Sequence, residues 1–220
     1  MEWLIDFFKI DTIMVTVFGY PLSYLEAAAT VLTLACIIFA ARANIATFTL
    51  GVLSTILYFL FFYQARLYSS MALQVIFLCF NIYGYYQWTR PKTGEENDKN
   101  QLKVGRYKAN KYWLFAGIIV VGTIIWGLIM SHPPTALAIE FAEAKYPYID
   151  AFILVASLVA QYMLAKKKIE NWIIWIIVDV IATGLYAASG AIFTAILYGV
   201  LVFNAIYGLY EWKKMYKNNE

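Results

Sequence analysis

The chain has 220 residues, of which 62% are hydrophobic and 14% are charged, with a formal net charge of +3. This composition excludes an ordinary soluble domain, because too few polar residues remain to cover its surface. Apolar stretches of about 20 residues recur without the alternation typical of barrel strands, so the sequence predicts an all-α integral membrane protein.

The first twenty residues mix charged and aromatic side chains. Glu2 and Asp6 alternate with Trp3, Phe7 and Phe8. This mixture predicts an amphipathic helix lying at the membrane interface over residues 1–20, in place of a cleavable signal peptide.

Seven transmembrane segments follow in chain order. We predict them at residues 22–41, 44–63, 69–89, 111–131, 147–165, 170–188 and 191–212. Fourteen of the seventeen Lys and Arg residues fall in one alternating set of connectors, and the other set holds Lys9, Arg66 and Lys145. Since cytoplasmic loops retain positive charge, seven spans are predicted, with the N-terminus outside and the C-terminus in the cytoplasm. The basic residues thus reflect membrane topology and predict no nucleic-acid partner.

An internal repeat is visible in the sequence. Residues 82–88 (IYGYYQW) resemble residues 206–212 (IYGLYEW) at an offset of 124, whereas Asn44 and Asn171 match at 127 and would require a small insertion. We therefore expect two parallel three-helix repeats joined by a linker helix, a 3+1+3 symmetry that resembles transporters of the SWEET type. The alternative is a duplicated helical bundle that serves as a scaffold.

The predicted organisation has seven parts. They are an interfacial helix at 1–20, the first repeat at 21–89, a charged cytoplasmic loop at 90–110, the linker helix at 111–131, a periplasmic loop at 132–146, the second repeat at 147–212 and a cytoplasmic tail at 213–220.

One ionisable residue falls at the centre of a predicted membrane helix. Asp179 lies midway through the sixth segment, and insertion of such a carboxylate costs roughly 2.5–3.5 kcal/mol, which marks it as a functional candidate. Trp172, Trp175 and Asp179 are spaced three and four residues apart and share one helical face. The alternatives are a helix-packing hydrogen bond for Asp179 and an interfacial position for Trp172.

Uncharged polar residues add further candidates at corresponding depths of the third and seventh segments. They are Gln74, Asn81, Tyr198 and Asn204. Buried amides either join helices through hydrogen bonds or face a wet cavity, and both interpretations remain open for Asn81, whereas the aromatic neighbours of Asn204 favour a cavity.

The motifs of catalysis are missing from the sequence. We find no nucleophile paired with a base, no metal-ligand spacing and no glycine-rich phosphate loop, so we expect neither an enzyme nor a cofactor. Cys36 and Cys79 lie in apolar runs, and His132 lies in an outer loop.

The sequence resembles the PnuC family of bacterial nicotinamide riboside transporters. The residues that carry the resemblance are the stripe of Trp172, Trp175 and Asp179, followed by Tyr198 and Asn204. The resemblance runs from about residue 21 to 212. It implies facilitated diffusion across the inner membrane by alternating access, trapping of the cargo by a cytoplasmic kinase, contact with membrane lipid and a homotrimer. Related thiamine or riboflavin transporters, a SWEET-like sugar carrier and a membrane scaffold remain as alternatives.

The candidate residues suit a cationic nucleoside. A tryptophan ring can stack on a pyridinium with about 1–2 kcal/mol of cation–π stabilisation. Asp179 can accept from ribose hydroxyls or offset the positive charge. Amides such as Gln74, Asn81 and Asn204 donate and accept, as a carboxamide or a hydroxyl requires.

Overall fold

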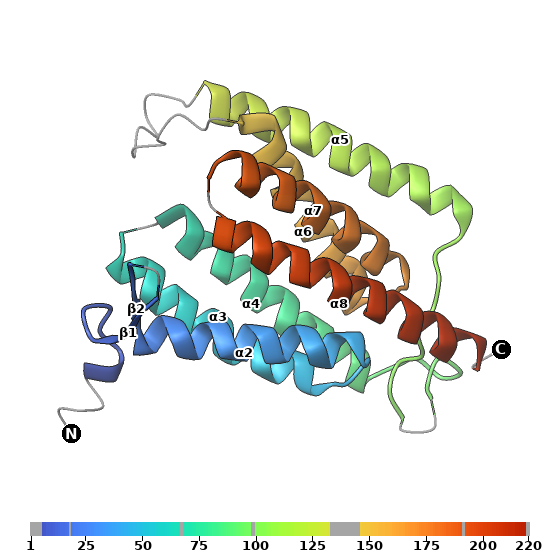
Figure 1. The fold of residues 1–220 in the computed structure, drawn as a ribbon. Helices are drawn as coiled ribbons and strands as arrows, with labels where there is room; N and C mark the ends of the chain where they lie inside the picture. Colours follow the sequence, from blue (N-terminus) through green and yellow to red (C-terminus); the bar gives the residue numbers. More distant parts are fainter. Residues whose placement is uncertain are drawn as a thin grey trace. The chain divides into compact units, whose positions relative to one another are not determined.

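A computed structural model describes residues 6–17, 19–66, 68–97, 100–132, 146–190 and 192–218 of the chain. Seven long helices and one two-stranded hairpin make up the described residues (Figure 1). The elements are β1 (Ile13–Val17), β2 (Tyr20–Ser23), α2 (Tyr24–Ala41), α3 (Ala46–Gln64), α4 (Tyr68–Thr89), α5 (Ala109–Ser131), α6 (Pro147–Ala165), α7 (Glu170–Ala188) and α8 (Ile192–Lys217). The prediction of seven helices is confirmed, and each predicted segment coincides with one of them.

Six of these helices are long and apolar enough to cross a membrane, namely α2, α3, α5, α6, α7 and α8. The remaining helix, α4, has 22 residues but carries Gln74, Asn81 and Gln87, which lower its hydropathy. The chain is therefore a multi-pass membrane protein.

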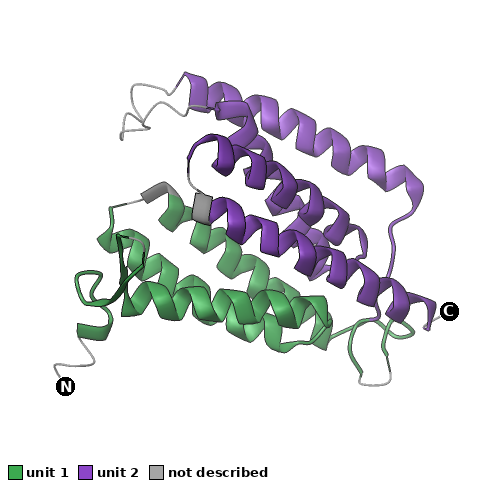
Figure 2. Ribbon diagram, viewed as in Figure 1, with its two compact units in different colours: residues 1–102 green, residues 103–220 purple. Residues whose placement is uncertain are grey.

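The chain divides into two compact units, residues 1–102 and 103–220 (Figure 2). In unit 1, α2 packs against α3 and α3 packs against α4. In unit 2, α5 packs against α6, α6 against α7 and α7 against α8. Within each unit, the helix contacts thus join helices that are consecutive in the sequence.

The turn between the first two helices of each predicted repeat has similar geometry in the two units. Ala43, between α2 and α3, has a φ of 50°, and Lys167, between α6 and α7, has a φ of 54°. The Ala43 N–H donates to the carbonyl of Ala40 at 2.9 Å, and the Lys167 N–H donates to the carbonyl of Leu164 at 2.8 Å. All four residues correspond at the offset of 124.

The turns that follow α3 and α7 also correspond at the offset of 124. Arg66 follows α3 with a φ of 58°, and Gly190 follows α7 with a φ of 80°, again 124 residues apart. The insertion expected from Asn44 and Asn171 is therefore wrong. Both turns have equal lengths in the two units, so Asn171 corresponds to Thr47, and Asn44 corresponds to a lysine.

The N-terminal segment differs from the sequence-based prediction. Within residues 1–20, Ile13–Val17 forms a strand that pairs antiparallel with Tyr20–Ser23, so the prediction of a helix is wrong there. The β-branched residues of IMVTV favour a strand. Gly19, at a φ of +86°, adopts the turn conformation that glycine reaches without strain. The predicted helical residues 1–5 lie outside the described residues.

Helix α8 is longer than predicted. It continues to Lys217, whereas the predicted segment ends at residue 212 and is followed by a predicted tail at 213–220. Its counterpart α4 ends at Thr89, which corresponds to Lys213. Lys214 and Lys217 in the last turn favour this extension, because cations stabilise a helix C-terminus.

Candidate functional site

Asp179 is buried inside unit 2. Its side chain lies on α7 and is 4% exposed, beside the buried Val178, whereas Ile177 and Val180 on the same helix are exposed. The hydroxyl of Thr183 donates to the Asp179 backbone carbonyl at 2.7 Å. A carboxylate in this position is costly to place in a membrane helix and needs a polar or cationic partner.

A stacked pair of tyrosines joins this helix to α8, and one of the two, Tyr198, interacts electrostatically with this carboxylate. The rings of Tyr186 and Tyr198 stack at a centroid distance of 5.2 Å and an interplanar angle of 22°. Tyr198 lies within electrostatic range of Asp179, and Tyr186 lies within range of Asp150. The pair connects α7 with α8.

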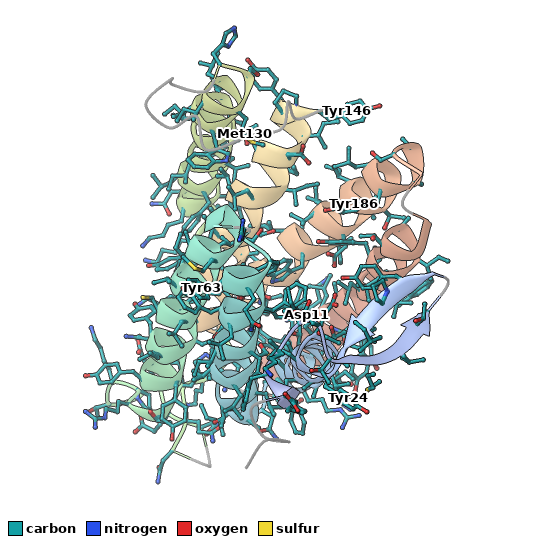
Figure 3. The ribbon with its side chains drawn as sticks, turned by 90° about the vertical axis from the view of Figure 1, so that its left-hand side faces the viewer. Asp11, Tyr24, Tyr63, Met130, Tyr146 and Tyr186 are labelled. Carbon is teal, nitrogen blue, oxygen red and sulfur yellow. The ribbon has the colours of Figure 1, made fainter. Side chains whose placement is uncertain are left out.

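Sequence reasoning missed Tyr186, which lies near the end of α7 (Figure 3). It follows Asp179 by seven residues, which is about two helical turns, so both residues belong to the same face. Extending the stripe of Trp172, Trp175 and Asp179 by this spacing would have found it.

Trp172 packs inside unit 2 and is 3% exposed. Its ring lies against Gly208 of α8 so closely that a Cβ added there would overlap the indole. Its other neighbour is Trp212, whose ring meets it edge-on at 5.6 Å and 84°. The indole Nε1 has no hydrogen-bond partner among the described residues.

Unit 1 contains the same arrangement at the repeat offset. Phe48 corresponds to Trp172, Gly84 to Gly208 and Trp88 to Trp212. A Cβ at Gly84 would overlap the Phe48 ring, and Phe48 meets Trp88 at 4.8 Å and 88°. Because both units use this ring for helix packing, the geometry favours a structural role for Trp172.

Trp175 lies one turn further along α7 and is half-buried. It corresponds to Gly51 of unit 1, where a Cβ would overlap the amide of the buried Asn81. The counterpart of Asn81 on α8 is the buried Ala205. Unit 1 thus has a small residue on the first helix and a larger one on the second, whereas unit 2 has the large Trp175 and the small Ala205. Trp175 is therefore the aromatic candidate whose packing differs between the two units.

The amide candidates occupy different units. Asn204 is half-buried on α8 of unit 2, and Gln74 is half-buried on α4 of unit 1, together with the buried Asn81. Trp172, Trp175, Asp179, Tyr198 and Asn204 therefore belong to the paired helices α7 and α8 of unit 2. Asn81 faces Gly51, which is a packing contact within unit 1.

A second polar cluster, which the sequence did not reveal, lies at the start of α7. Glu170 is 7% exposed and accepts from the Tyr107 N–H at 3.3 Å and the Tyr112 hydroxyl at 3.0 Å, and Arg106 Nε lies 3.6 Å away. The Gly105 N–H also donates to the Lys167 carbonyl at 3.0 Å. These contacts hold the segment before α5 against the α6–α7 turn.

The cluster at Asp179 contains a buried carboxylate, stacked tyrosines and a half-buried indole, which together can bind a polar, aromatic or cationic solute. A family model described as nicotinamide mononucleotide transporter matches residues 23–214. The chain belongs to this family. The membership confirms the resemblance to the PnuC transporters and identifies the chain as a membrane transporter.

Several curated proteins align with most of this chain. The "Nicotinamide riboside transporter PnuC" of Escherichia coli (strain K12) is 29% identical over 225 residues, covering 94% of each chain. The protein of the same name from Neisseria mucosa is 26% identical and covers 99% of this chain and 81% of its own. The "Riboflavin/roseoflavin transporter RibM" of Streptomyces davaonensis is 27% identical over 174 residues, covering 78% of this chain and 76% of its own.

A solved structure shares the fold. The "Crystal structure of the Vitamin B3 transporter PnuC" superimposes with a TM-score of 0.66 at 22% identity, covering 90% of this chain and 83% of that chain. At this level of identity the likeness supports the architecture described above.

Proposed function

We propose that the protein carries nicotinamide riboside across the membrane by facilitated diffusion. The single observation that carries the proposal is the buried carboxylate of Asp179 beside the Tyr186–Tyr198 pair, in a chain that belongs to the nicotinamide mononucleotide transporter family. A permanently cationic pyridinium offers this carboxylate a compensating charge inside the membrane. Two of the relatives reported above are named nicotinamide riboside transporter, and each aligns with this chain over most of its length. Their names support the same cargo.

Each candidate residue has a role that its chemistry allows. Trp175 stacks on the pyridinium, with about 1–2 kcal/mol of cation–π stabilisation. Asp179 offsets the positive charge or accepts from ribose hydroxyls, while Tyr198 and Asn204 hydrogen-bond the ribose or the carboxamide. Gln74 and Asn81 remain polar candidates of unit 1, where Asn81 packs against Gly51, and Trp172 holds α7 against α8 in unit 2.

The transport cycle follows from the repeat. The chain crosses the inner membrane seven times, with the N-terminus outside and the C-terminus in the cytoplasm, so the two three-helix repeats are parallel. Alternating movement of the repeats exposes the site to each side of the membrane in turn. A cytoplasmic kinase phosphorylates the riboside and so retains it. The protein assembles as a homotrimer.

A second candidate cargo is a neutral vitamin with an aromatic ring system. The riboflavin/roseoflavin transporter of Streptomyces davaonensis is 27% identical to this chain, a level close to that of the riboside transporters. An isoalloxazine also stacks on tryptophan, but as a neutral ring it gains less from Asp179. The carboxylate therefore favours the cationic cargo.

The test is calorimetric titration of the purified protein in detergent with nicotinamide riboside, riboflavin, thiamine and a simple sugar. The same titrations on Asp179→Asn and Trp175→Ala locate the site. We expect binding of the riboside alone, weakened by about tenfold or more in each variant. Binding of riboflavin with no dependence on Asp179 would overturn the cargo assignment, and a folded protein that binds none of the four would refute the transport site.

Facilitated diffusion and trapping need a separate measurement. Proteoliposomes that contain the purified protein should equilibrate labelled riboside without a proton or ion gradient. Encapsulation of a riboside kinase with ATP should then raise the retained label above the equilibrium level. Accumulation against a gradient without the kinase would contradict facilitated diffusion.

A further inference from the structure

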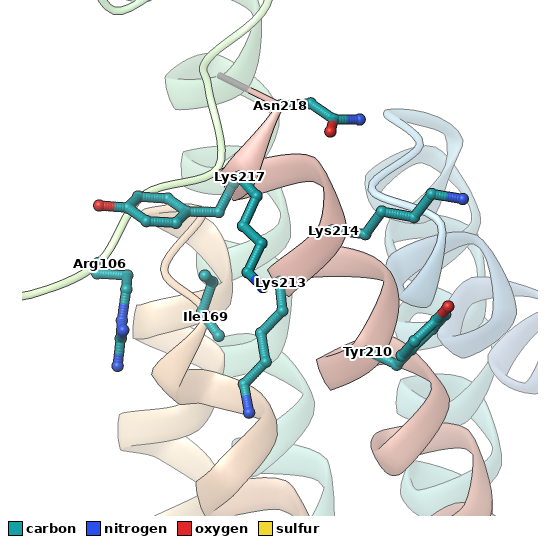
Figure 4. Close-up of a pocket in the computed structure, with 8 residues that line it drawn as sticks. Arg106, Ile169, Tyr210, Lys213, Lys214, Lys217 and Asn218 are labelled. Carbon is teal, nitrogen blue, oxygen red and sulfur yellow. The ribbon is translucent and has the colours of Figure 1, made fainter. Parts of the chain in front are cut away.

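A basic pocket lies at the C-terminal end of α8 in unit 2. Its volume is about 720 Å³. It is lined by Arg106, Ile169, Tyr210, Lys213, Lys214, Tyr216, Lys217 and Asn218. Four of these eight residues are cationic, and Ile169, Tyr210 and Tyr216 give the pocket an apolar part (Figure 4). This pocket is separate from Asp179 and the stacked tyrosines, none of which lines it.

Two of the three lysines of the pocket, Lys214 and Lys217, come from the part of α8 that extends beyond its counterpart α4. Helix α4 ends at Thr89, which corresponds to Lys213, so Lys217 lies on an extra helical turn of the second repeat. Lys213 and Lys217 are four residues apart on one face, and like charges at this spacing destabilise a helix. Figure 4 shows both between Arg106 and Lys214, which extends to the side away from Arg106.

The setting of these charges favours an anion. The side chain of Arg106 is 53% exposed, and its Nε lies 3.6 Å from the carboxylate of Glu170, which is the acidic group that faces it from α7. Among the described residues, the three lysines of the pocket form no ion pair, so most of its positive charge is not neutralised by a bound carboxylate. Membrane topology accounts for basic residues on the cytoplasmic side of the bilayer, but it does not account for their lining one pocket together with two tyrosines.

We propose that this pocket binds a phosphate-bearing anion. Phosphate oxygens accept charge-assisted hydrogen bonds from lysine and arginine, and an arginine fork can hold two of them at once. A volume of about 720 Å³ is large enough for a nucleotide or for a lipid headgroup. Basic pockets beside transmembrane helices are a known setting for anionic headgroups, and a soluble phosphate ester presents the same chemistry.

The site does not depend on the proposed transport of a riboside, since its residues and its charge differ from those around Asp179. The first arm of the test uses protein purified in a neutral detergent and titrated calorimetrically with inorganic pyrophosphate and with adenosine 5′-monophosphate. The second arm counts phosphatidylglycerol and phosphatidylcholine molecules retained by the protein from an equal mixture, using native mass spectrometry. A soluble ligand gives a signal in the first arm, and a headgroup gives a preference for phosphatidylglycerol in the second.

The variant Lys213→Gln/Lys217→Gln removes two charges from the pocket. The variant Arg90→Gln/Lys92→Gln removes two charges from the loop after α4, outside the pocket, and serves as the matched control. We expect the pocket variant to weaken binding, or to reduce the lipid preference, by about tenfold, while the control keeps at least about half of it. An Asp179→Asn variant should bind the same probes as the wild type.

The proposal is overturned if neither soluble probe binds and phosphatidylglycerol is not preferred. It is also overturned if the two double variants weaken binding equally, because the effect would then be one of overall charge. Circular dichroism and size-exclusion profiles identical to those of the wild type show that each variant is folded.

Discussion

The indole ring of Trp172 lies directly against the backbone of Gly208, with no room for a methyl group between α7 and α8. The same relationship exists 124 residues earlier, between Phe48 and Gly84. An aromatic ring on one helix and a glycine on the next therefore define how closely these helices approach in both units. Small residues allow this close approach, which stabilises membrane helix pairs through packing.

Gly208→Ala should destabilise the protein. The added methyl overlaps the Trp172 ring, and overpacking of this kind typically costs about 1–3 kcal/mol. The matched control is Gly199→Ala on the same helix, where nothing lies within 4 Å of the added Cβ. Thermal unfolding in detergent, followed by tryptophan fluorescence, should show a lower melting temperature for the first variant only. Equal effects of both variants would contradict the packing role.

Arg66→Gly should stabilise the protein. Arg66 adopts a φ of 58°, a conformation that costs a non-glycine residue roughly 1–2 kcal/mol, whereas the corresponding turn of unit 2 already contains Gly190 at 80°. We expect a gain of up to about 1 kcal/mol. Arg66→Ala keeps the backbone cost and removes the charge, so it should show no such gain. The reverse change, Gly190→Ala, should lower the melting temperature.

The stability of the protein should rise with pH above about 8. Lys167 is 2% exposed in the turn between α6 and α7, and burial lowers its pKa from 10.5 to about 8. The folded protein thus loses this proton at a lower pH than the unfolded chain does. Below the folded pKa the buried charge destabilises the protein, and this penalty is relieved between about pH 8 and 10.5 by an amount of the order of 1–3 kcal/mol.

Melting temperatures measured between pH 7 and pH 10 test this expectation. The increase above pH 8 should be present in the wild type and in Lys92→Met, which alters an exposed lysine. It should be much smaller in Lys167→Met. The same pH dependence in all three proteins would assign the effect to other groups.

Tyr186→Phe should weaken binding of the cargo less than Asp179→Asn does. The phenylalanine keeps the ring that stacks on Tyr198 at 5.2 Å and loses only the hydroxyl group. One neutral hydrogen bond made by such a hydroxyl is worth about 0.5–1.5 kcal/mol, which is about tenfold in affinity at most, whereas the loss of a charge partner costs more. Calorimetric titration with nicotinamide riboside measures both variants. A larger loss for Tyr186→Phe would reverse their assigned roles.

The helices could be predicted from the sequence because each is a long apolar run bounded by polar turns. The predicted bounds 147–165 and 170–188 agree with those of α6 and α7. The hairpin of β1 and β2 was missed because the charged and aromatic residues before Ile13 resembled an amphipathic helix, although the β-branched run and Gly19 favoured a strand and a turn.

Only part of the candidate site could be predicted from the sequence. The stripe from Trp172 to Asp179 follows from helical periodicity, but periodicity does not tell which ring a glycine on another helix contacts, so the packing role of Trp172 required the structure. The same holds for Glu170, whose partners Tyr107 and Tyr112 are about 60 residues away in the sequence. Contacts between distant segments leave no periodic trace.

Within each unit, the packing of helices that are consecutive in the sequence bears on how the protein is made. Each helix of a unit packs against the helix before it or the helix after it in the sequence, so within a unit no helix waits for a distant one to be synthesised. Unit 1 has all three of its helices by residue 102, when more than half of the chain is still to be translated. The first unit is thus expected to assemble in the bilayer while the ribosome is still translating the second.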